Sequence, residues 1–317
     1  MCDESTLTSE KINMITGKLL GDGCITKQKG RKPRFQFIHA TSDKEWCFYC
    51  YDKLITVLPL TPPYYKKVHD NRIQKGYTEC YQVQSRTDSF ITLLESIWYQ
   101  DRKKIIPFQF LDQFLNEIAL AWWYQDDGHL ALKNNIPQKI ILSTDNFSSA
   151  ENLGLRDLLT KKFRLNFKLD SQNRLLLYDQ LQIFYFHNLI EPYIHPSMKR
   201  KITPPRFSYK VAKRTTIYLP STIKLSKPTL EIHKNLEHLQ SLYEIIMNRN
   251  SYIDLYKDVI LPLQLNQETK GYQIIINEPN SFIIQSIKNK TGLTASQITT
   301  ICFLLTHKYD RATLLNN

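Results

Sequence analysis

Two apolar segments of this sequence end in the same way, with an aspartate followed by a glycine. The first is INMITGKLLGDGCI, residues 12–25, and the second is IALAWWYQDDGHL, residues 118–130. Their Asp-Gly pairs begin at Asp22 and Asp127, a spacing of 105 residues. Each segment has the length and apolar content of a buried helix, and similar patterns follow both. The sequence therefore predicts an internal repeat, with a first and a second half that fold alike.

Short stretches that alternate between apolar and polar residues follow each of these helices. RFQFIHAT (34–41) and CYQVQSR (80–86) show this pattern in the first half, and FRLNFKLD (163–170) shows it in the second. Such alternation predicts strands with one apolar face, which helices cover, and one polar face that stays open. Each half is expected to run helix-strand-strand-helix-strand-strand-helix, which gives an α+β fold.

The pattern of the 317-residue sequence changes at about Tyr218, where a linker-like stretch with two prolines follows the second half. We expect the first half over 1–108, the second half over 109–217 and a mostly helical extension over 218–317. The extension contains the pattern of a helix, a turn at Gly292 and a second helix capped at Thr294. This pattern fits a helix-turn-helix that docks on DNA or a helical hairpin that packs on the main body, and the common spacing favours the hairpin.

The charge of the chain is strongly basic, with 42 Lys and Arg against 30 Asp and Glu and a formal net charge of +12. Such an excess favours a polyanionic partner, and nucleic acid is the commonest. A basic enzyme with no such partner is the alternative that charge alone leaves open.

The six cysteines include one CxxC pair, Cys47 and Cys50, within a stretch that predicts an amphipathic helix. A second pair at zinc-site spacing is absent from the sequence, so packing in the core is favoured over metal binding. Reduced thiols indicate an intracellular protein, and the sequence contains no apolar run long enough to span a bilayer. The acidic, polar N-terminal stretch lacks the character of a signal or transit peptide.

On a basic protein, the presence of a carboxylate at the end of each apolar helix requires a physical explanation. Burying a carboxylate is unfavourable unless something offsets it, and an acid at a helix C-terminus opposes the helix dipole. Divalent metal ions held by carboxylates supply an activated water and charge stabilisation, which phosphodiester hydrolysis needs. Asp22 and Asp127, one from each half, match the two scissile phosphates of a DNA duplex. A helix end exposed to solvent is the alternative.

The segments ITGKLLGDG and LAWWYQDDG resemble the two copies of the signature of LAGLIDADG homing endonucleases in their single-chain, pseudo-dimeric form. DRKKIIPFQFL resembles the Lys-Lys-x-Ile-Pro element of the omega-type intron endonucleases (LAGLIDADG type 2), and LIEPYIHPSMKRKI resembles their Pro-Tyr-x-x-Pro-x-Met-x-x-Lys element. The resemblance extends from about Ile12 to Pro204. It implies two αββαββα domains that form a β-saddle, with the signature helices packed together at its centre.

The resemblance assigns the metal site. Asp22 and Asp127 stand at the catalytic metal-binding positions, and the predicted metal site also includes Gly21 and Asp126. We expect Asp126 to be at most a group behind the metal ligands or a charge at the helix end. Trp122 stands where the signature has a small glycine. The implied cofactor is Mg²⁺, as two or three divalent ions at the domain interface. Mn²⁺ is expected to substitute for it, and Ca²⁺ to bind without turnover.

Two lysines match the active-site lysines of the family, Lys104 in the first half and Lys201 in the second. Each could orient or activate the attacking water, or stabilise the charge that develops on the phosphate. Their neighbours Lys103 and Lys199 are the alternatives, because either member of each pair could be a lysine that only contacts phosphate.

The function that the resemblance implies is that of a monomeric, intron-encoded, site-specific endonuclease. It would cut both strands of DNA at a long recognition site and leave 3′ overhangs, in a mitochondrion or chloroplast if organelle-encoded and otherwise in the bacterial cytoplasm. One alternative is a maturase that binds intron RNA and assists group I splicing. Another is a non-catalytic DNA-binding regulator, against which both Asp-Gly pairs and both lysine elements speak.

Candidate DNA contacts are basic or amide side chains of two kinds. Phosphate-contacting residues give affinity and salt dependence without sequence preference, and we expect them in basic loops: Lys27, Lys29, Arg31, Lys32, Lys66, Lys67 and Arg72. Base-reading residues are expected on the open faces of the sheets, because Arg and Gln hydrogen-bond to guanine and adenine: Arg34, Gln36, Gln82, Gln84, Arg86, Lys139, Lys168 and Arg174.

Overall fold

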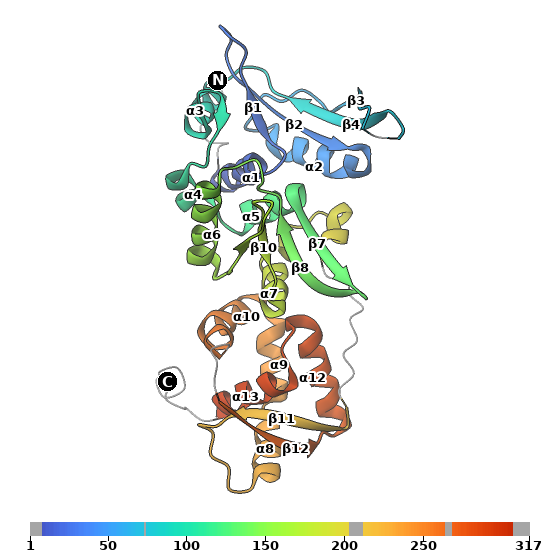
Figure 1. Cartoon of the computed structure of the whole chain (residues 1–317), viewed down its shortest axis with the longest axis vertical. Coiled ribbons are helices and arrows are strands. Elements are labelled where there is room, and N and C mark those ends of the chain that lie inside the picture. Colours follow the sequence, from blue (N-terminus) through green and yellow to red (C-terminus); the bar gives the residue numbers. More distant parts are fainter. Residues whose placement is uncertain (1–7, 73, 203–211, 264–267, 307–317) are drawn as a thin grey trace. The chain divides into compact units, whose positions relative to one another are not determined.

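The computed structural model describes residues 8–72, 74–202, 212–263 and 268–306 of the chain (Figure 1). The chain divides into two compact units, the first of Met1–Asp179 with Leu189–Thr203 and the second of Gln180–Asn188 with Pro204–Asn317. The three-part division predicted at residues 108 and 217 stays a prediction. Among the described residues, no helix is long and apolar enough to cross a membrane.

The first half of the repeat has the predicted order of helices and strands. Its four strands form one antiparallel sheet in the order β1-β2-β4-β3. The first helix begins after Thr8, whose side chain accepts a hydrogen bond from the backbone N–H of Lys11;. The elements are α1 (Ser9–Leu20), β1 (Cys24–Thr26), β2 (Arg34–Ala40), α2 (Lys44–Leu54), β3 (Tyr64–His69), β4 (Tyr77–Gln84) and α3 (Ser89–Trp98).

The second half repeats this order after a short connection of β5 (Tyr99–Gln100), β6 (Lys103–Lys104) and α4 (Phe108–Phe114). Its antiparallel sheet has the equivalent order, β7-β8-β10-β9. Its elements are α5 (Glu117–Asp127), β7 (Gly128–Lys133), β8 (Ile136–Leu142), α6 (Ser149–Phe163), β9 (Lys168–Leu169), β10 (Leu175–Leu177) and α7 (Gln180–Ile190). The α+β fold and the duplication are therefore as predicted.

The first sheet is apolar on one face, as its alternation predicts. Phe35 and Phe37 of β2 are fully buried, and helix α2 packs on the same sheet. Cys47 and Cys50 lie in this core as free, fully buried thiols, as predicted for residues that pack in the core. His39, two residues after Phe37, is also buried on this face. A buried imidazole ring needs hydrogen-bond partners, and those of His39 lie at the candidate active site.

The predicted strand over 163–170 is wrong for residues 163–167. Helix α6 includes Phe163, and Arg164 ends it in the left-handed conformation, with φ of 59°. The strand β9 contains only Lys168 and Leu169. The apolar residues Leu165 and Phe167 are buried without being part of a strand, so their alternation reflects packing rather than strand structure.

The second unit is mostly helical, as predicted, and its helices accompany one two-stranded antiparallel ribbon. This unit includes most of α7, the last helix of the second half of the repeat. Its other elements are β11 (Arg214–Pro220), α8 (Pro228–Leu236), α9 (Leu239–Met247), α10 (Arg249–Leu255), a π-helical turn (Tyr256–Ile260), α11 (Leu261–Leu263), β12 (Thr269–Ile275), α12 (Glu278–Thr291) and α13 (Ala295–Thr306).

Helices α12 and α13 form the predicted helix-turn-helix pattern. Gly292 ends α12 with φ of +73°, and the Thr294 side chain accepts a hydrogen bond from the Gln297 backbone N–H at 3.2 Å;. Ile298, Thr299, Thr300, Ile301, Cys302 and Phe303 of α13 are all buried. A helix that reads a DNA groove must expose its side chains. The burial of α13, which packs on β11 and α8, therefore favours a hairpin packed within its own unit over the DNA-docking motif, and packing on the main body stays a prediction.

Candidate active site

Helices α1 and α5 lie side by side and bring the two Asp-Gly pairs together (Figure 1). The contact is close because two glycines face larger residues of α5: Gly17 within α1 and Gly21 at its C-cap. A Cβ atom on Gly17 would lie 2.5 Å from the Cβ of Trp122, and one on Gly21 would lie 2.5 Å from the Cβ of Asp126. The small residue that the signature needs at the level of Trp122 is therefore supplied by Gly17, on the opposite helix.

Asp127 is the last residue of α5, and its carboxylate lies among other charges. Burial and the negative charges of Asp22 and Asp126 raise the pKa of Asp127 to about 7, against the positive charges of Lys104 and Lys201. In the part of the chain that the structure describes, no hydrogen-bond donor reaches this carboxylate. The predicted pair of aspartates is therefore brought together, and Asp127 is the member whose carboxylate accepts no hydrogen bond from the described residues.

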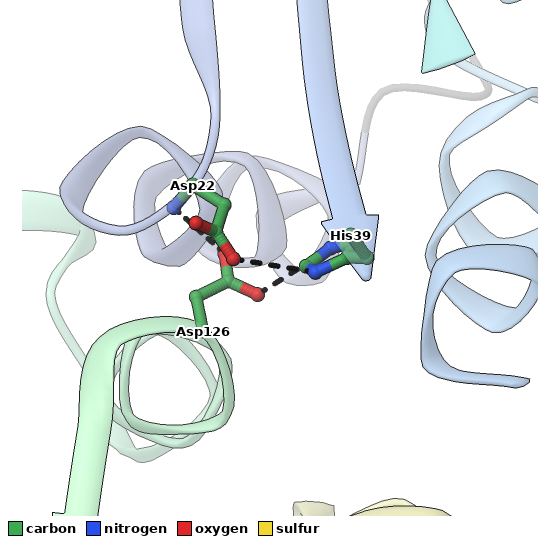
Figure 2. Close-up of side chains that lie close together, drawn as sticks. All are labelled: Asp22, His39 and Asp126. Atoms are coloured by element: carbon green, nitrogen blue, oxygen red, sulfur yellow. Dashed lines mark hydrogen bonds and ion pairs between the residues drawn. The ribbon is translucent and has the colours of Figure 1, made fainter. Parts of the chain in front are cut away.

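Asp22 has a different environment, which Figure 2 shows. The Nδ1 atom of His39 lies 3.2 Å from Oδ2 of Asp22, whose side chain is 35% exposed. Burial opposes ionisation of Asp22, but the hydrogen bond from His39 and the charge of Lys18 outweigh it and lower the pKa of this carboxyl. The two halves thus hold their aspartates differently. The surroundings of Asp22 favour its ionised form, and those of Asp127 oppose ionisation.

Asp126 is a structural ion-pair partner at the contact between the halves. Its side chain is fully buried, and its Oδ1 accepts hydrogen bonds from Lys18 Nζ at 3.0 Å and Trp46 Nε1 at 2.8 Å. Its Oδ2 accepts the backbone N–H of Asp22 at 3.1 Å. Burial disfavours the charged form of Lys18, but Asp126 raises the pKa of this lysine well above its ordinary value. Asp126 therefore holds α5 to α1, and both of its oxygens are occupied by donors.

Ligand atoms of Asp22, His39 and Asp126 all lie within 4.8 Å of one another, an arrangement that could hold a metal ion. The Oδ1 atom of Asp126 is already shared by Lys18 and Trp46, and the Nε2 atom of His39 lies 2.7 Å from Lys18 Nζ. Of these three residues, Asp22 is the one that keeps an exposed carboxylate oxygen for a cation. The hard oxygen donors that remain at the centre are those of Asp22 and Asp127.

Lys104 and Lys201 lie at the ends of the two signature helices. Lys104 of β6 donates a hydrogen bond from Nζ to the carbonyl of Gly23 at 2.8 Å. Lys201 ends a 3₁₀ helix (Pro196–Lys201) and donates to the carbonyls of Gln125 at 2.6 Å and Asp126 at 3.0 Å. Each lysine thus contacts the backbone beside the Asp-Gly pair of its own half, where free helix carbonyls favour a cation.

Burial lowers the pKa of both Lys104 and Lys201, although nearby aspartates act in the opposite direction. Their neighbours Lys103 and Lys199 are exposed and have no such contact with the helix ends. In each pair, the lysine that we favoured from the sequence is therefore the one that contacts the end of a signature helix. The catalytic role of Lys104 and Lys201 stays a prediction.

Three residues of this site were not identified from the sequence: His39, Lys18 and Trp46. Lys18 stands inside the apolar run of α1, and a lysine there must find a buried acid. His39 continues the inward-facing series of Phe35 and Phe37 and must find a polar partner. Both signals were present in the sequence, but neither names Asp126 as the shared partner.

The structure gathers the predicted base-reading residues of the first half on the open sheet face. Gln82 and Gln84 each donate to the side-chain oxygen of Gln36 at 3.3 Å, and Arg34 donates to that of Gln84 at 3.5 Å. Lys66 reaches Gln82 at 3.3 Å, and this glutamine is 7% exposed. The result is one continuous array of amide and basic groups. Arg86 is exposed just beyond β4.

A basic cavity of about 300 Å³ adjoins this array. Its lining contains cations and neutral polar groups and no acid, which suits a phosphate. The lining residues are Thr26, Gln28, Arg31, Lys32, Arg34, Gln84 and Thr87. Lys29 and Lys67 are exposed. Lys66 and Lys67 lie in strand β3 and not in the loop expected from the sequence, and their contact with phosphate stays a prediction.

Other predicted DNA contacts are engaged within the chain. Lys27 forms an ion pair with Glu95 at 3.0 Å, Arg72 with Asp70 at 2.8 Å and Arg174 with Asp170 at 2.7 Å. These pairs hold their own turns or neighbouring elements, so such cations are less available to DNA. In the second half, Lys168 is exposed and Lys139 is part-buried. Contact of any of these residues with DNA stays a prediction.

Comparison with known proteins identifies the fold and the family. Cytochrome b mRNA maturase bI2 of Debaryomyces hansenii is 29% identical over 204 residues, 62% of this chain and 74% of that protein. Probable intron-encoded endonuclease 1 of Wickerhamomyces canadensis is 27% identical over 212 residues, 62% of this chain and 86% of that protein.

Among solved structures, the homing endonuclease I-WcaI bound to its DNA recognition sequence is similar to this chain. The TM-score is 0.54 at 25% identity, over 62% of this chain and 87% of that one. Residues 12–182, which include both signature helices and Asp22, Asp126 and Asp127, match the LAGLIDADG DNA endonuclease family. The chain belongs to this family.

Proposed function

We propose that this chain is an intron-encoded homing endonuclease that makes a metal-dependent double-strand break at one long DNA site. The observation that carries the proposal is the pairing of Asp22 and Asp127, one from each half, with a lysine beside each. A protein with two such half-sites can act on both strands of a duplex. Cleavage that leaves 3′ overhangs, and action as a monomer, follow from the family resemblance.

The residues at the centre fit a hard divalent cation. Mg²⁺ binds one or two carboxylates together with waters and phosphate oxygens, and Asp22 and Asp127 are such carboxylates. Burial, and then the negative charges of Asp22 and Asp126, raise the pKa of Asp127, and a divalent cation would favour its ionised form. When bound, the ions supply an activated water and stabilise charge on the leaving oxygen. Mn²⁺ would substitute, and Ca²⁺ would bind without turnover. Gly21 stays a predicted member of the metal site.

The side chains of this site have separate tasks in the proposed reaction. Asp22 and Asp127 would hold the cations, and His39 fixes the position of the Asp22 carboxylate through its hydrogen bond. Lys104 and Lys201 lie at the helix ends with their Nζ donors. They would orient the attacking water or stabilise the charge on the phosphate in the transition state. Asp126 keeps the two helices in register and does not touch the DNA.

The open sheet faces would bind the duplex. Arg34, Gln36 and Gln84 present guanidinium and amide groups, which read guanine and adenine in the major groove. Gln82 is buried and would support them through its hydrogen bond to Gln36. The basic cavity beside the array would hold a backbone phosphate. The protein would act in an organelle if an organellar intron encodes it.

The test is cleavage of the intron-less allele of the gene that carries this reading frame. Purified protein with Mg²⁺ should cut this DNA once on each strand, and sequencing of the ends should show 3′ overhangs. Ca²⁺ in place of Mg²⁺ should allow binding without cutting. No cutting of the intron-less allele, with the folded protein in excess, would remove the proposal.

A maturase is the second candidate, because the Debaryomyces hansenii relative is named an mRNA maturase. In that role the chain would bind its intron RNA and assist group I splicing. A variant with both Asp22→Asn and Asp127→Asn separates the two activities. Splicing assistance by this cleavage-dead variant would support the maturase role, and loss of splicing assistance in a variant that still binds DNA would contradict it.

A further inference from the structure

The ribbon of the second unit, β11 with β12, has one buried and one open face. Ile217, Leu219 and Ile274 are buried, and helices α13 and α8 pack against the ribbon. The register pairs Arg214 with Ile275, Thr216 with Gln273 and Tyr218 with Gly271. These six residues are exposed and form the open face. We call them the ribbon face.

The ribbon face repeats the chemistry of the first sheet. Arg214 donates a hydrogen bond from its guanidinium to the side-chain oxygen of Gln273 at 2.7 Å. On the first sheet, Arg34 donates in the same way to Gln84 at 3.5 Å. In both places a cross-strand glutamine holds an arginine above an open antiparallel surface. Arginine and glutamine are the side chains that read guanine and adenine.

The aromatic residue of the ribbon face has a defined place. Tyr218 is 55% exposed, and its ring edge lies 3.1 Å from where a Cβ atom of Gly271 would be. The missing side chain at Gly271 leaves room for the edge of this ring on the neighbouring strand. Ile275, 57% exposed, adds an apolar contact beside Arg214, of the kind that packs on the methyl group of thymine.

The charge around the ribbon suits a polyanion. The stretches 212–227 and 268–277 contain Lys213, Arg214, Lys224, Lys227 and Lys270 against the single acid Glu268. All five cations are exposed. Cations at the borders of a reading surface contact phosphates, which gives affinity without sequence preference.

From these observations we propose that the ribbon face is a second DNA-reading surface, which extends the recognition site of the proposed endonuclease into adjacent major groove. A two-stranded ribbon fits the major groove of B-DNA, whereas the major groove of A-form RNA is too deep and narrow for side chains to read. Alternate residues on a strand are about 7 Å apart, comparable to two base-pair steps. The inference rests on the proposed function, since it needs a DNA target.

The experiment maps the contacts of the full-length protein on a DNA fragment that carries its cleavage site. Hydroxyl-radical footprints and binding titrations without Mg²⁺ compare the wild type with an Arg214→Ala/Gln273→Ala double variant. The double variant should lose protection over one segment at the side of the target and bind roughly tenfold more weakly. The position of the cut should not change.

Lys257→Ala/Gln240→Ala is the matched control, because it removes one cation and one amide from elsewhere in the second unit. Arg214→Lys keeps the charge and should lose sequence preference in the outer segment while it retains most of the affinity. An unchanged footprint and affinity in the double variant, with cutting intact, would overturn this inference alone. Weaker binding to a structured RNA with all DNA contacts intact would overturn it as well. Failure of the wild type to cut DNA would instead remove the proposed function.

Discussion

Replacing Asp127 with asparagine is expected to stabilise the first unit above neutral pH while it abolishes the proposed cleavage. Burial and the negative charges of Asp22 and Asp126 raise the pKa of Asp127 from 3.8 to about 7. Between these values the folded chain keeps a proton that the unfolded chain has lost. The stability that this group contributes therefore falls as the pH rises. An asparagine carries no charge and removes the penalty.

The size of the effect follows from the pKa difference. One pKa unit corresponds to about 1.4 kcal/mol, so the ionised carboxylate destabilises the fold by roughly 4 kcal/mol well above pH 7. At pH 5 the same pKa values give about 2 kcal/mol, because most folded molecules keep the proton. The stability of the variant relative to the wild type should therefore rise by roughly 2–3 kcal/mol from pH 5 to pH 8. This change with pH does not depend on what burial of the amide itself costs.

Urea unfolding without divalent ions measures this difference. All four tryptophans, Trp46, Trp98, Trp122 and Trp123, belong to the first unit, so their fluorescence reports on it. Asp145→Asn, which changes an exposed aspartate of the same half, is the control and should show no comparable trend. A stability difference for Asp127→Asn that stays constant from pH 5 to pH 8 would refute the electrostatic reasoning.

Three further predictions concern the same contact between the halves. Lys18→Met leaves Asp126 buried without its cation and should lower the free energy of unfolding, measured with urea, by roughly 3–5 kcal/mol. Adding Asp126→Leu should recover much of this stability. Additive losses in the double variant would contradict the buried ion pair. Gly17→Ala places a Cβ atom 2.5 Å from the Cβ of Trp122 and should cost roughly 1–3 kcal/mol, so an unchanged unfolding midpoint would argue against the close helix contact. Mg²⁺ should raise the thermal unfolding midpoint of the wild type but not of Asp127→Asn in scanning fluorimetry; an equal rise in both would place the cation elsewhere.

The sequence predicts those parts of the fold that depend on local pattern. The repeated Asp-Gly helices and the alternating strands are local signals, and they give the order of elements in both halves. The same rule misplaces the strand at residues 163–167, because Leu165 and Phe167 alternate while Arg164 has a left-handed conformation that belongs to a helix end. Alternation records which side chains are buried, and a loop against a core can produce it too.

The interior of the site depends on contacts that no local pattern encodes. Asp126 was expected at most behind the ligands or as a helix-end charge, yet it is a fully buried partner of Lys18 and Trp46. Its partners come from α1 and α2, far away in sequence. In the second unit the helix pattern predicts α12 and α13, but only the packing shows that α13 is buried.

The central claim is that Asp22 and Asp127, one from each half, form one active site for a double-strand break. The most direct measurement is cleavage of the intron-less target by Asp22→Asn and Asp127→Asn, each compared with the wild type and with Asp145→Asn. Each active-site variant should bind the target and lose double-strand cutting by at least about 100-fold, while Asp145→Asn cuts as the wild type does. Double-strand cutting at the wild-type rate by either active-site variant would contradict the account.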